Sequence, residues 1–251
     1  MVAWCVSRGH PAIFVAGSDD DFLRQHLEHP EQPTAYGDAG GVVSYGVAKA
    51  AVGIEETVRF FAVDGLRRVM PRVDIRSGAP VVRGCRMMKS PAELALMRTA
   101  SDITVAAYRH AAPRIRAGMS PREIGAIMAA AHGALGGVHG FALVLLGEAS
   151  AYPHGSGKPQ AVREGEVVLM DCGCTVEGYQ SDISRTFVFG TASAEQRRVW
   201  QQMRAGQQIA IEAARVGVPA GKVDDAVRAQ YEKWGYGPGY QLPGLSHRTG
   251  H

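Results

Sequence analysis

Residues 167–189 read VVLMDCGCTVEGYQSDISRTFVF, a stretch whose pattern predicts two β-strands joined by a tight turn. The first apolar run ends at Asp171, and the second strand begins at Asp182, eleven positions later. A hairpin centred between Val176 and Glu177 would set the two aspartates opposite each other. Opposed residues on antiparallel strands point to the same face, with Cβ atoms about 5 Å apart.

The two aspartates, if buried at that distance, repel each other and lose their hydration. A shared proton, a basic partner or a divalent metal ion would each relieve the repulsion. Hard divalent cations prefer oxygen ligands, and paired aspartates can hold two ions about 3.5–4 Å apart. The alternative is a pair of solvent-exposed turn carboxylates, with Arg185 close to Asp182 in the sequence. Asp171 suits that alternative less well, because four apolar residues precede it.

Three histidines lie in segments that could complete such a site. His154 precedes the flexible Gly-Ser-Gly of residues 155–157, and His247 and His251 belong to the sequence HRTGH. An imidazole is a suitable ligand for zinc and for first-row transition metals. For His132 and His139 we expect the ordinary alternative, a surface position or a core position with its hydrogen bonds satisfied.

Composition excludes several classes of protein. The 251 residues are 46% hydrophobic and 20% charged, with a net charge of +3, and the basic residues are scattered rather than clustered as a nucleic-acid surface requires. Four cysteines are too few for a disulfide framework. Cys172 and Cys174 lie in an apolar run, where cysteine serves as a small apolar residue more often than as a redox or metal pair. Neither a membrane span nor a secretory signal is present, so a cytoplasmic protein is expected.

The order of elements predicts two parts. Residues 1–84 have the pattern of a small α/β unit, and residues 85–251 that of helices packed outside a largely antiparallel sheet. Helix-start patterns occur at Ser90, Ser120 and Ser193, each followed three positions later by Glu or Gln. In the helix after Ser90, the face expected to pack comprises Leu94, Met97, Ala100, Ile103, Thr104, Ala107 and Tyr108.

Several segments of the second part resemble the creatinase/prolidase/aminopeptidase P family. Its core signature is matched by HG at 154–155, VLMDCG at 168–173 and GYQSDISRT at 178–186. SHRTGH at 246–251 resembles the start of that family's next motif, and RMMKSPAE at 86–93 resembles the opening of its catalytic domain. The resemblance covers residues 83–251, and the preceding residues resemble the family's smaller N-terminal domain more weakly.

The resemblance implies an α/β (α+β) architecture: a pita-bread catalytic domain over residues 85–251, incomplete at its C-terminus, after a small α/β domain over residues 1–84. It also implies two divalent ions (manganese, cobalt or zinc) held by two aspartates, one histidine and two glutamates. By position, Asp171 and Asp182 match the aspartate ligands, and His251 matches the histidine ligand. His154 matches a histidine that lines the substrate site, and His247 one that lies four positions before the ligand, so both are expected at the catalytic site.

The function that follows from the resemblance is metal-dependent hydrolysis of peptide bonds at Xaa-Pro. The expected partners are a peptide with proline at its second position and a second copy of the chain, without nucleic acid or membrane. The family's two glutamate ligands follow the ligand histidine, and this sequence ends at His251, so we expect the 251-residue chain to be inactive or very weak. Two alternatives stay open: a non-catalytic binding or scaffold protein with this fold, and a metal-free hydrolase resembling creatinase. The presence of Asp171, Asp182 and His251 argues against the scaffold, whereas the absence of the two glutamates from this sequence argues for it. The aspartate pair makes the metal-free hydrolase the least expected of the three.

Overall fold

The computed structural model describes residues 14–15, 51–69, 71–72, 74–152, 155–236 and 249. The chain forms two compact units, Met1–Ser90 and Pro91–His251. The division into functional domains at residue 84 stays a prediction. The other elements expected before residue 51, and the histidines at 154, 247 and 251, lie outside the described residues.

The first unit contains a parallel sheet with strand order β1-β2-β3. Its elements are β1 (Phe14–Val15), β2 (Ala51–Ile54), α4 (Phe60–Val69), β3 (Asp74–Ser77) and α5 (Ala79–Met87). Parallel neighbours need a crossover, and α4 supplies the one between β2 and β3. Val52 and Ile54 of β2 are buried, with Val58, Val63 and Leu66 packed against them.

The second unit contains an antiparallel sheet in which β5 is the central strand, flanked by β4 on one side and by β6 and β7 on the other. Its strands are β4 (Val138–Leu146), β5 (Val167–Val176), β6 (Tyr179–Gln180) and β7 (Ile183–Val188). Its helices are α6 (Pro91–Ala111), α7 (Pro121–Ala134), α8 (Ala194–Ala213) and α9 (Ala220–Lys233), with 3₁₀ turns η2 (Ala112–Arg114) and η3 (Gly147–Ala151).

Two of the predicted helix starts are confirmed in detail. Ser120 begins α7 and Ser193 begins α8, and each has a complete capping box with Glu123 or Gln196. The serine oxygen accepts a backbone N–H of the first turn, and the glutamate or glutamine reaches back to the serine N–H, so two donors without helical partners are satisfied.

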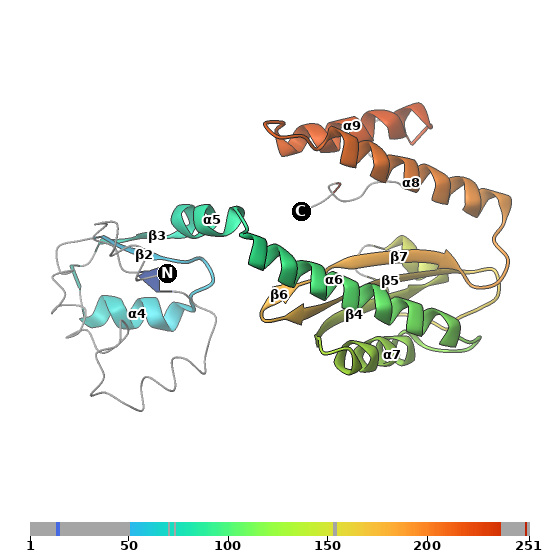
Figure 1. Cartoon of the computed structure of the whole chain (residues 1–251), viewed down its shortest axis with the longest axis horizontal. Helices are drawn as coiled ribbons and strands as arrows, with labels where there is room; N and C mark the ends of the chain where they lie inside the picture. The colour runs from blue at the N-terminus through green and yellow to red at the C-terminus, as the bar shows by residue number, and fades with distance from the viewer. Residues whose placement is uncertain are drawn as a thin grey trace. The chain divides into compact units, whose positions relative to one another are not determined.

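The core of the second unit lies between one face of its sheet and the two helices α6 and α7, which lie side by side (Figure 1). Val168, Met170 and Cys172 alternate along β5 and are all buried in this core. Cys172 and Cys174 are thus small apolar core residues, as expected, and burial raises the pKa of Cys172 to about 11. The expectation that Leu94 packs is wrong: its side chain is 54% exposed in the first turn of α6.

Across the described residues, no helix has the length and apolar character needed to cross a bilayer.

Candidate metal site

The hairpin between β5 and β6 turns one residue later than the sequence predicted. Val176 pairs with Tyr179, so the two-residue turn is Glu177-Gly178, and both residues have positive φ (49° and 79°). Such a turn matches the right-handed twist of the strands it joins. Its positive φ angles favour glycine, which has no Cβ atom. The centre therefore falls between Glu177 and Gly178, not between Val176 and Glu177.

This shift changes the partner of Asp171. Asp171 pairs with Ser184, whose hydroxyl donates to Asp171 Oδ1 at 2.8 Å. The same register places Asp182 level with Gly173. The predicted direct opposition of the two aspartates is thus wrong, and they are diagonal neighbours. Diagonal neighbours on one face lie roughly 7 Å apart, which is still within reach of a shared ligand.

Strand alternation places both aspartates on the face of the sheet opposite α6 and α7. Asp171 is half-buried and Asp182 is exposed, so the expected burial of the pair is wrong for Asp182. Arg185 alternates to the helix side, where its guanidinium lies 5.9 Å from the centre of the Tyr108 ring. The exposure of Asp182 agrees with the alternative of an exposed turn carboxylate for that residue, although Arg185 lies on the other side of the sheet.

The strand that returns from the turn is interrupted at Ser181, which directly precedes Asp182. In a regular antiparallel pair, the Ser181 carbonyl would accept the Cys174 N–H. Here the Ser181 hydroxyl accepts that N–H at 3.0 Å, while the Ser181 N–H still donates to the Cys174 carbonyl at 2.9 Å. The side chain has replaced a backbone group in the ladder, and β6 and β7 are separate strands for this reason.

The displaced Ser181 carbonyl occupies the space above Gly173. A Cβ atom at residue 173 would lie 2.1 Å from the Ser181 oxygen and 2.7 Å from Cε1 of Phe141. Only glycine permits so close an approach of two backbones. The close approach therefore requires glycine at position 173, between Cys172 and Cys174, and no local sequence pattern indicated this requirement.

A buried polar network lies beneath this interruption. The hydroxyl of Thr104, on α6, is 2.7 Å from Ser181 Oγ and 3.3 Å from His132 Nε2. His132 is fully buried on α7, and its Nδ1 is 2.9 Å from Nδ1 of His139 on β4. Burial, and then the neighbouring His139, lowers the pKa of His132 below its ordinary value. The expectation that His132 is a core residue with satisfied hydrogen bonds is confirmed.

One assignment of the ring and hydroxyl protons satisfies the contacts that join His139, His132, Thr104 and Ser181 in a chain. His139 Nδ1–H donates to His132 Nδ1, and His132 Nε2–H donates to Thr104. Thr104 then donates to Ser181, whose own proton goes to the Cys174 carbonyl at 3.2 Å.

A second side chain of α6 contacts the same hairpin. The Tyr108 hydroxyl donates its single proton between the carbonyl oxygens of Met170, at 2.9 Å, and Ile183, at 2.7 Å. Burial raises the pKa of Tyr108, so the phenol stays neutral and remains a donor. Neither Thr104 nor Tyr108 was singled out by motif. Their place on the packed face of a predicted helix was the available signal.

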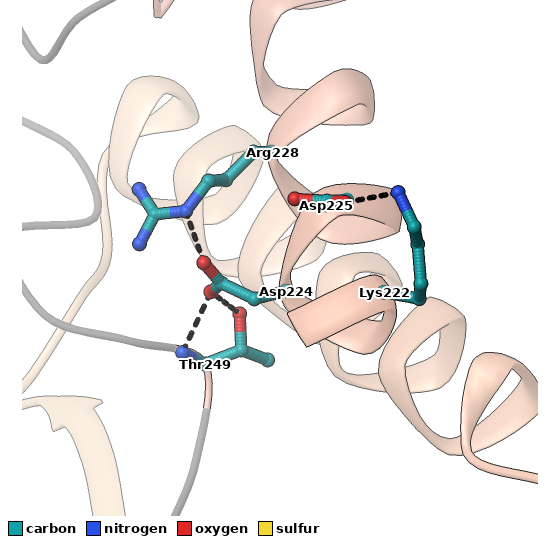
Figure 2. A network of polar contacts seen from close by, with 5 residues as sticks. All are labelled: Lys222, Asp224, Asp225, Arg228 and Thr249. Carbon is teal, nitrogen blue, oxygen red and sulfur yellow. Dashed lines mark hydrogen bonds and ion pairs between the residues drawn. The ribbon is translucent and has the colours of Figure 1, made fainter. Parts of the chain in front are cut away.

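The segment that carries His247 and His251 is described only at Thr249. Asp224, on α9, accepts hydrogen bonds at Oδ1 from the Thr249 backbone N–H (2.9 Å) and from its hydroxyl (2.5 Å). Oδ2 of Asp224 accepts from Arg228 Nε (Figure 2). The hydrogen bond from Arg228, followed by those from Thr249, lowers the pKa of Asp224 to about 2, although its partial burial acts in the opposite direction.

The Asp224 contacts are expected to make stability depend on acid pH. Because the folded pKa is below the ordinary value of 3.8, the stabilisation is complete above about pH 4 and is lost as the pH falls towards 2. Asp224→Asn should lower the free energy of unfolding by about 1–2 kcal/mol at neutral pH, and the difference from the unaltered chain should vanish near pH 2.

Urea unfolding at a series of pH values measures this effect. Asp225→Asn is the matched control, because Asp225 is exposed and forms a surface ion pair with Lys222, 2.9 Å away (Figure 2). Such pairs contribute little to stability. A pH-independent difference for Asp224→Asn would contradict the prediction.

The described part of the candidate metal site thus consists of two carboxylates on one face of the sheet. Their four oxygen atoms suit hard or borderline divalent cations. The described residues contain no group of three or more histidine, cysteine, aspartate or glutamate side chains that could hold a metal. The candidate histidine ligand His251 lies outside the described residues, as do His154 and His247.

Comparison with known proteins gives this hairpin a context. Residues 95–251 match metallopeptidase family M24, and this match includes both aspartates and the whole second sheet. The chain belongs to metallopeptidase family M24. The predicted creatinase/prolidase/aminopeptidase P relationship is confirmed.

Individual M24 relatives agree with this result. The Xaa-Pro dipeptidase of Pyrococcus furiosus is 28% identical over 202 residues, covering 79% of this chain and 58% of the relative. The prolidase structure from Pyrococcus horikoshii OT3 superposes with a TM-score of 0.70 at 26% identity, covering 78% of this chain and 57% of that one. The X-Pro aminopeptidase structure from Thermotoga maritima gives 0.68 at 26% identity, with 89% and 60% covered.

These similarities confirm the predicted mixed α/β, pita-bread fold of the M24 family. The chain spans slightly more than half the length of each of these three relatives.

Proposed function

We propose that this M24 chain serves metal-dependent hydrolysis of peptide bonds at Xaa-Pro sequences. The observation that carries the proposal is the placement of Asp171, on β5, and Asp182, between β6 and β7, on one face of the sheet, within the region that matches the family. The names of the relatives, Xaa-Pro dipeptidase and prolidase, supply the substrate class. A peptide with proline at its second position is the proposed substrate.

Asp171 and Asp182 are proposed to hold two divalent ions, with His251 on one of them. When bound, such a pair of ions supplies an acidified water and an electrophile for the amide oxygen. His154 is proposed to donate a hydrogen bond to the substrate or to the charge that develops on it, and His247 is proposed to line the same site. Manganese, cobalt or zinc as the metal, a homodimer and a cytoplasmic location remain predictions.

The chain's own aspartates have a defined part in this proposal. Their carboxylates provide negative charge on the face of the sheet away from the core, where a peptide can approach. Ser184 donates to one oxygen of Asp171 and leaves the second oxygen available to a metal. The half-buried position of Asp171 lowers the local dielectric constant, which strengthens its attraction for a cation.

The experiment is a calorimetric titration of the 251-residue chain with Mn²⁺, together with an assay of Xaa-Pro dipeptide hydrolysis in Mn²⁺ or Co²⁺. We expect Mn²⁺ binding that a chelator reverses, and hydrolysis that is weak or undetectable, because these 251 residues contain three of the five ligands that the family resemblance implies.

Each outcome of this experiment has a meaning. Absence of Mn²⁺ binding would favour the non-catalytic scaffold alternative and contradict the proposal. Robust turnover would support the peptidase function but contradict the need for two further glutamates. Hydrolysis that is unaffected by a chelator would favour a metal-free mechanism.

A further inference from the structure

Helix α6 contacts the aspartate-bearing hairpin at two points that bracket the candidate metal ligands. Tyr108 donates to the carbonyl of Met170, which precedes Asp171, and to the carbonyl of Ile183, which follows Asp182. Thr104 lies one helical turn earlier and contacts the hydroxyl of Ser181, which precedes Asp182. Residues four apart lie on the same face of a helix, so both contacts come from a single rigid element.

The first contact ties the two strands together. Tyr108 reaches carbonyls on β5 and on β7 at once, and the hydroxyl therefore fixes how far the Asp171 strand lies from the Asp182 strand. Its ring is buried among the side chains of the core, where it cannot rotate away to solvent. Because the phenol is neutral, the contact is a directed hydrogen bond with a preferred geometry.

The second contact supports the weakest point of the hairpin. At Ser181 the ladder lacks one regular backbone bond, since the Ser181 carbonyl lies over Gly173 and does not accept the Cys174 N–H. Asp182 is the next residue in the chain, so a change in the position of Ser181 is transmitted directly to it. Thr104 and Ser181 are fully or almost fully buried, and their hydrogen bond at 2.7 Å connects this point to α6 and onward to His132.

Both contacts lie on the side of the sheet opposite the aspartate side chains. Thr104 and Tyr108 therefore do not reach a metal or a substrate themselves. Side chains behind the ligands of a metal site nevertheless set the position of those ligands, and their loss weakens metal binding. Such support matters more for diagonal neighbours, because the distance between the two aspartates depends on both the strand register and the strand spacing.

We propose that Thr104 and Tyr108 are positioning residues that hold Asp182 and Asp171 at the separation a pair of divalent ions requires. The inference rests on the proposed metal site and adds to it the two α6 side chains that define its geometry. It assigns no chemical step to either residue.

A titration of the folded chain with Mn²⁺ tests the inference. Its readouts are the affinity and the stoichiometry of Mn²⁺ binding. Tyr108→Phe and Thr104→Val each remove one hydroxyl while keeping the shape of the side chain. Each is expected to weaken Mn²⁺ binding by about 10-fold, the order of effect seen when outer partners of metal ligands are removed. Thr104→Ser restores a hydroxyl at the same position and should recover most of the affinity.

Matched controls separate positioning from general destabilisation. Tyr236→Phe removes a phenol hydroxyl that bonds Gln202, and Thr99→Val removes a hydroxyl of α6 that bonds the Ala95 carbonyl at the surface. Neither should change Mn²⁺ affinity. Circular dichroism confirms folding, and titrations are made well below the unfolding midpoint of each variant, so a purely structural role would leave affinity unchanged.

The possible outcomes distinguish this inference from the proposed function. If the unaltered chain binds Mn²⁺ through its aspartates, and Tyr108→Phe and Thr104→Val bind Mn²⁺ with the same affinity as the unaltered chain, the positioning role is overturned and the proposed function stands. If the unaltered chain shows no binding that depends on Asp171 or Asp182, both are overturned. Should Thr104→Val fail to fold, Tyr108→Phe decides the question in the same way.

Discussion

Gly173→Ala is expected to lower the free energy of unfolding by about 3 kcal/mol or more, because overpacking of this severity is at the upper end of its usual range. The new Cβ would lie 2.1 Å from the Ser181 carbonyl oxygen. Both sides of this contact are backbone or ring atoms, so neither can move aside as a flexible side chain would. The strand carrying Ser181 must shift, and Asp182 shifts with it. Chemical denaturation measures the loss of stability.

The same substitution should also remove Mn²⁺ binding from the molecules that fold, since Asp182 would move away from Asp171. Gly133→Ala is the control, because Gly133 lies in α7 with open space where its Cβ would be. Alanine favours a helix over glycine by about 1 kcal/mol, so this variant should be as stable as the unaltered chain or slightly more stable. A Gly173→Ala protein of unchanged stability would contradict the close approach described for Ser181.

Asp171→Asn is expected to weaken Mn²⁺ binding by more than about 100-fold, because even the loss of an outer partner of a metal ligand costs about 10–100-fold. Asparagine has the size of aspartate and keeps an oxygen for the Ser184 hydroxyl, but it lacks the negative charge that attracts a cation. Its effect on the free energy of unfolding should stay within about 0.5 kcal/mol, as for most substitutions outside the core. Calorimetry and denaturation measure the two quantities.

The control for Asp171→Asn is Asp225→Asn, which removes the same charge from an exposed position on α9 (Figure 2). Both variants change the net charge equally, so a non-specific effect of charge on Mn²⁺ would appear in both. Equal affinities for the Asp171→Asn protein and the unaltered chain would exclude Asp171 as a ligand.

Local patterns in the sequence predicted most elements of the second unit. Ser120 with Glu123 and Ser193 with Gln196 form the expected capping boxes, because each depends only on residues within one helical turn. The apolar run that ends at Asp171 correctly indicated a strand, and the structure shows that its alternate residues Val168, Met170 and Cys172 are buried. Local signals suffice for such features, since neighbouring residues make the decisive contacts.

The hairpin register was predicted one position too early. A Val-Glu-Gly-Tyr sequence allows several turns, and the observed turn takes both Glu177 and Gly178 into positive φ. The sequence alone favours glycine in such a turn, but it does not say whether the residue before or after glycine joins it. As a result, the cross-strand partner of Asp171 is Ser184 and not the predicted Asp182.

By itself, the sequence determined which residues form the strands and helices of the second unit, and it identified Asp171 and Asp182 as candidate ligands of an M24 metallopeptidase. Only the tertiary structure decided that the two aspartates are diagonal neighbours, and that side chains of α6 contact the hairpin from the opposite side of the sheet. The reason is that Gly173, Ser181 and the α6 residues Thr104 and Tyr108 meet through contacts between residues far apart in the chain. Such contacts follow from packing, which no short sequence pattern encodes.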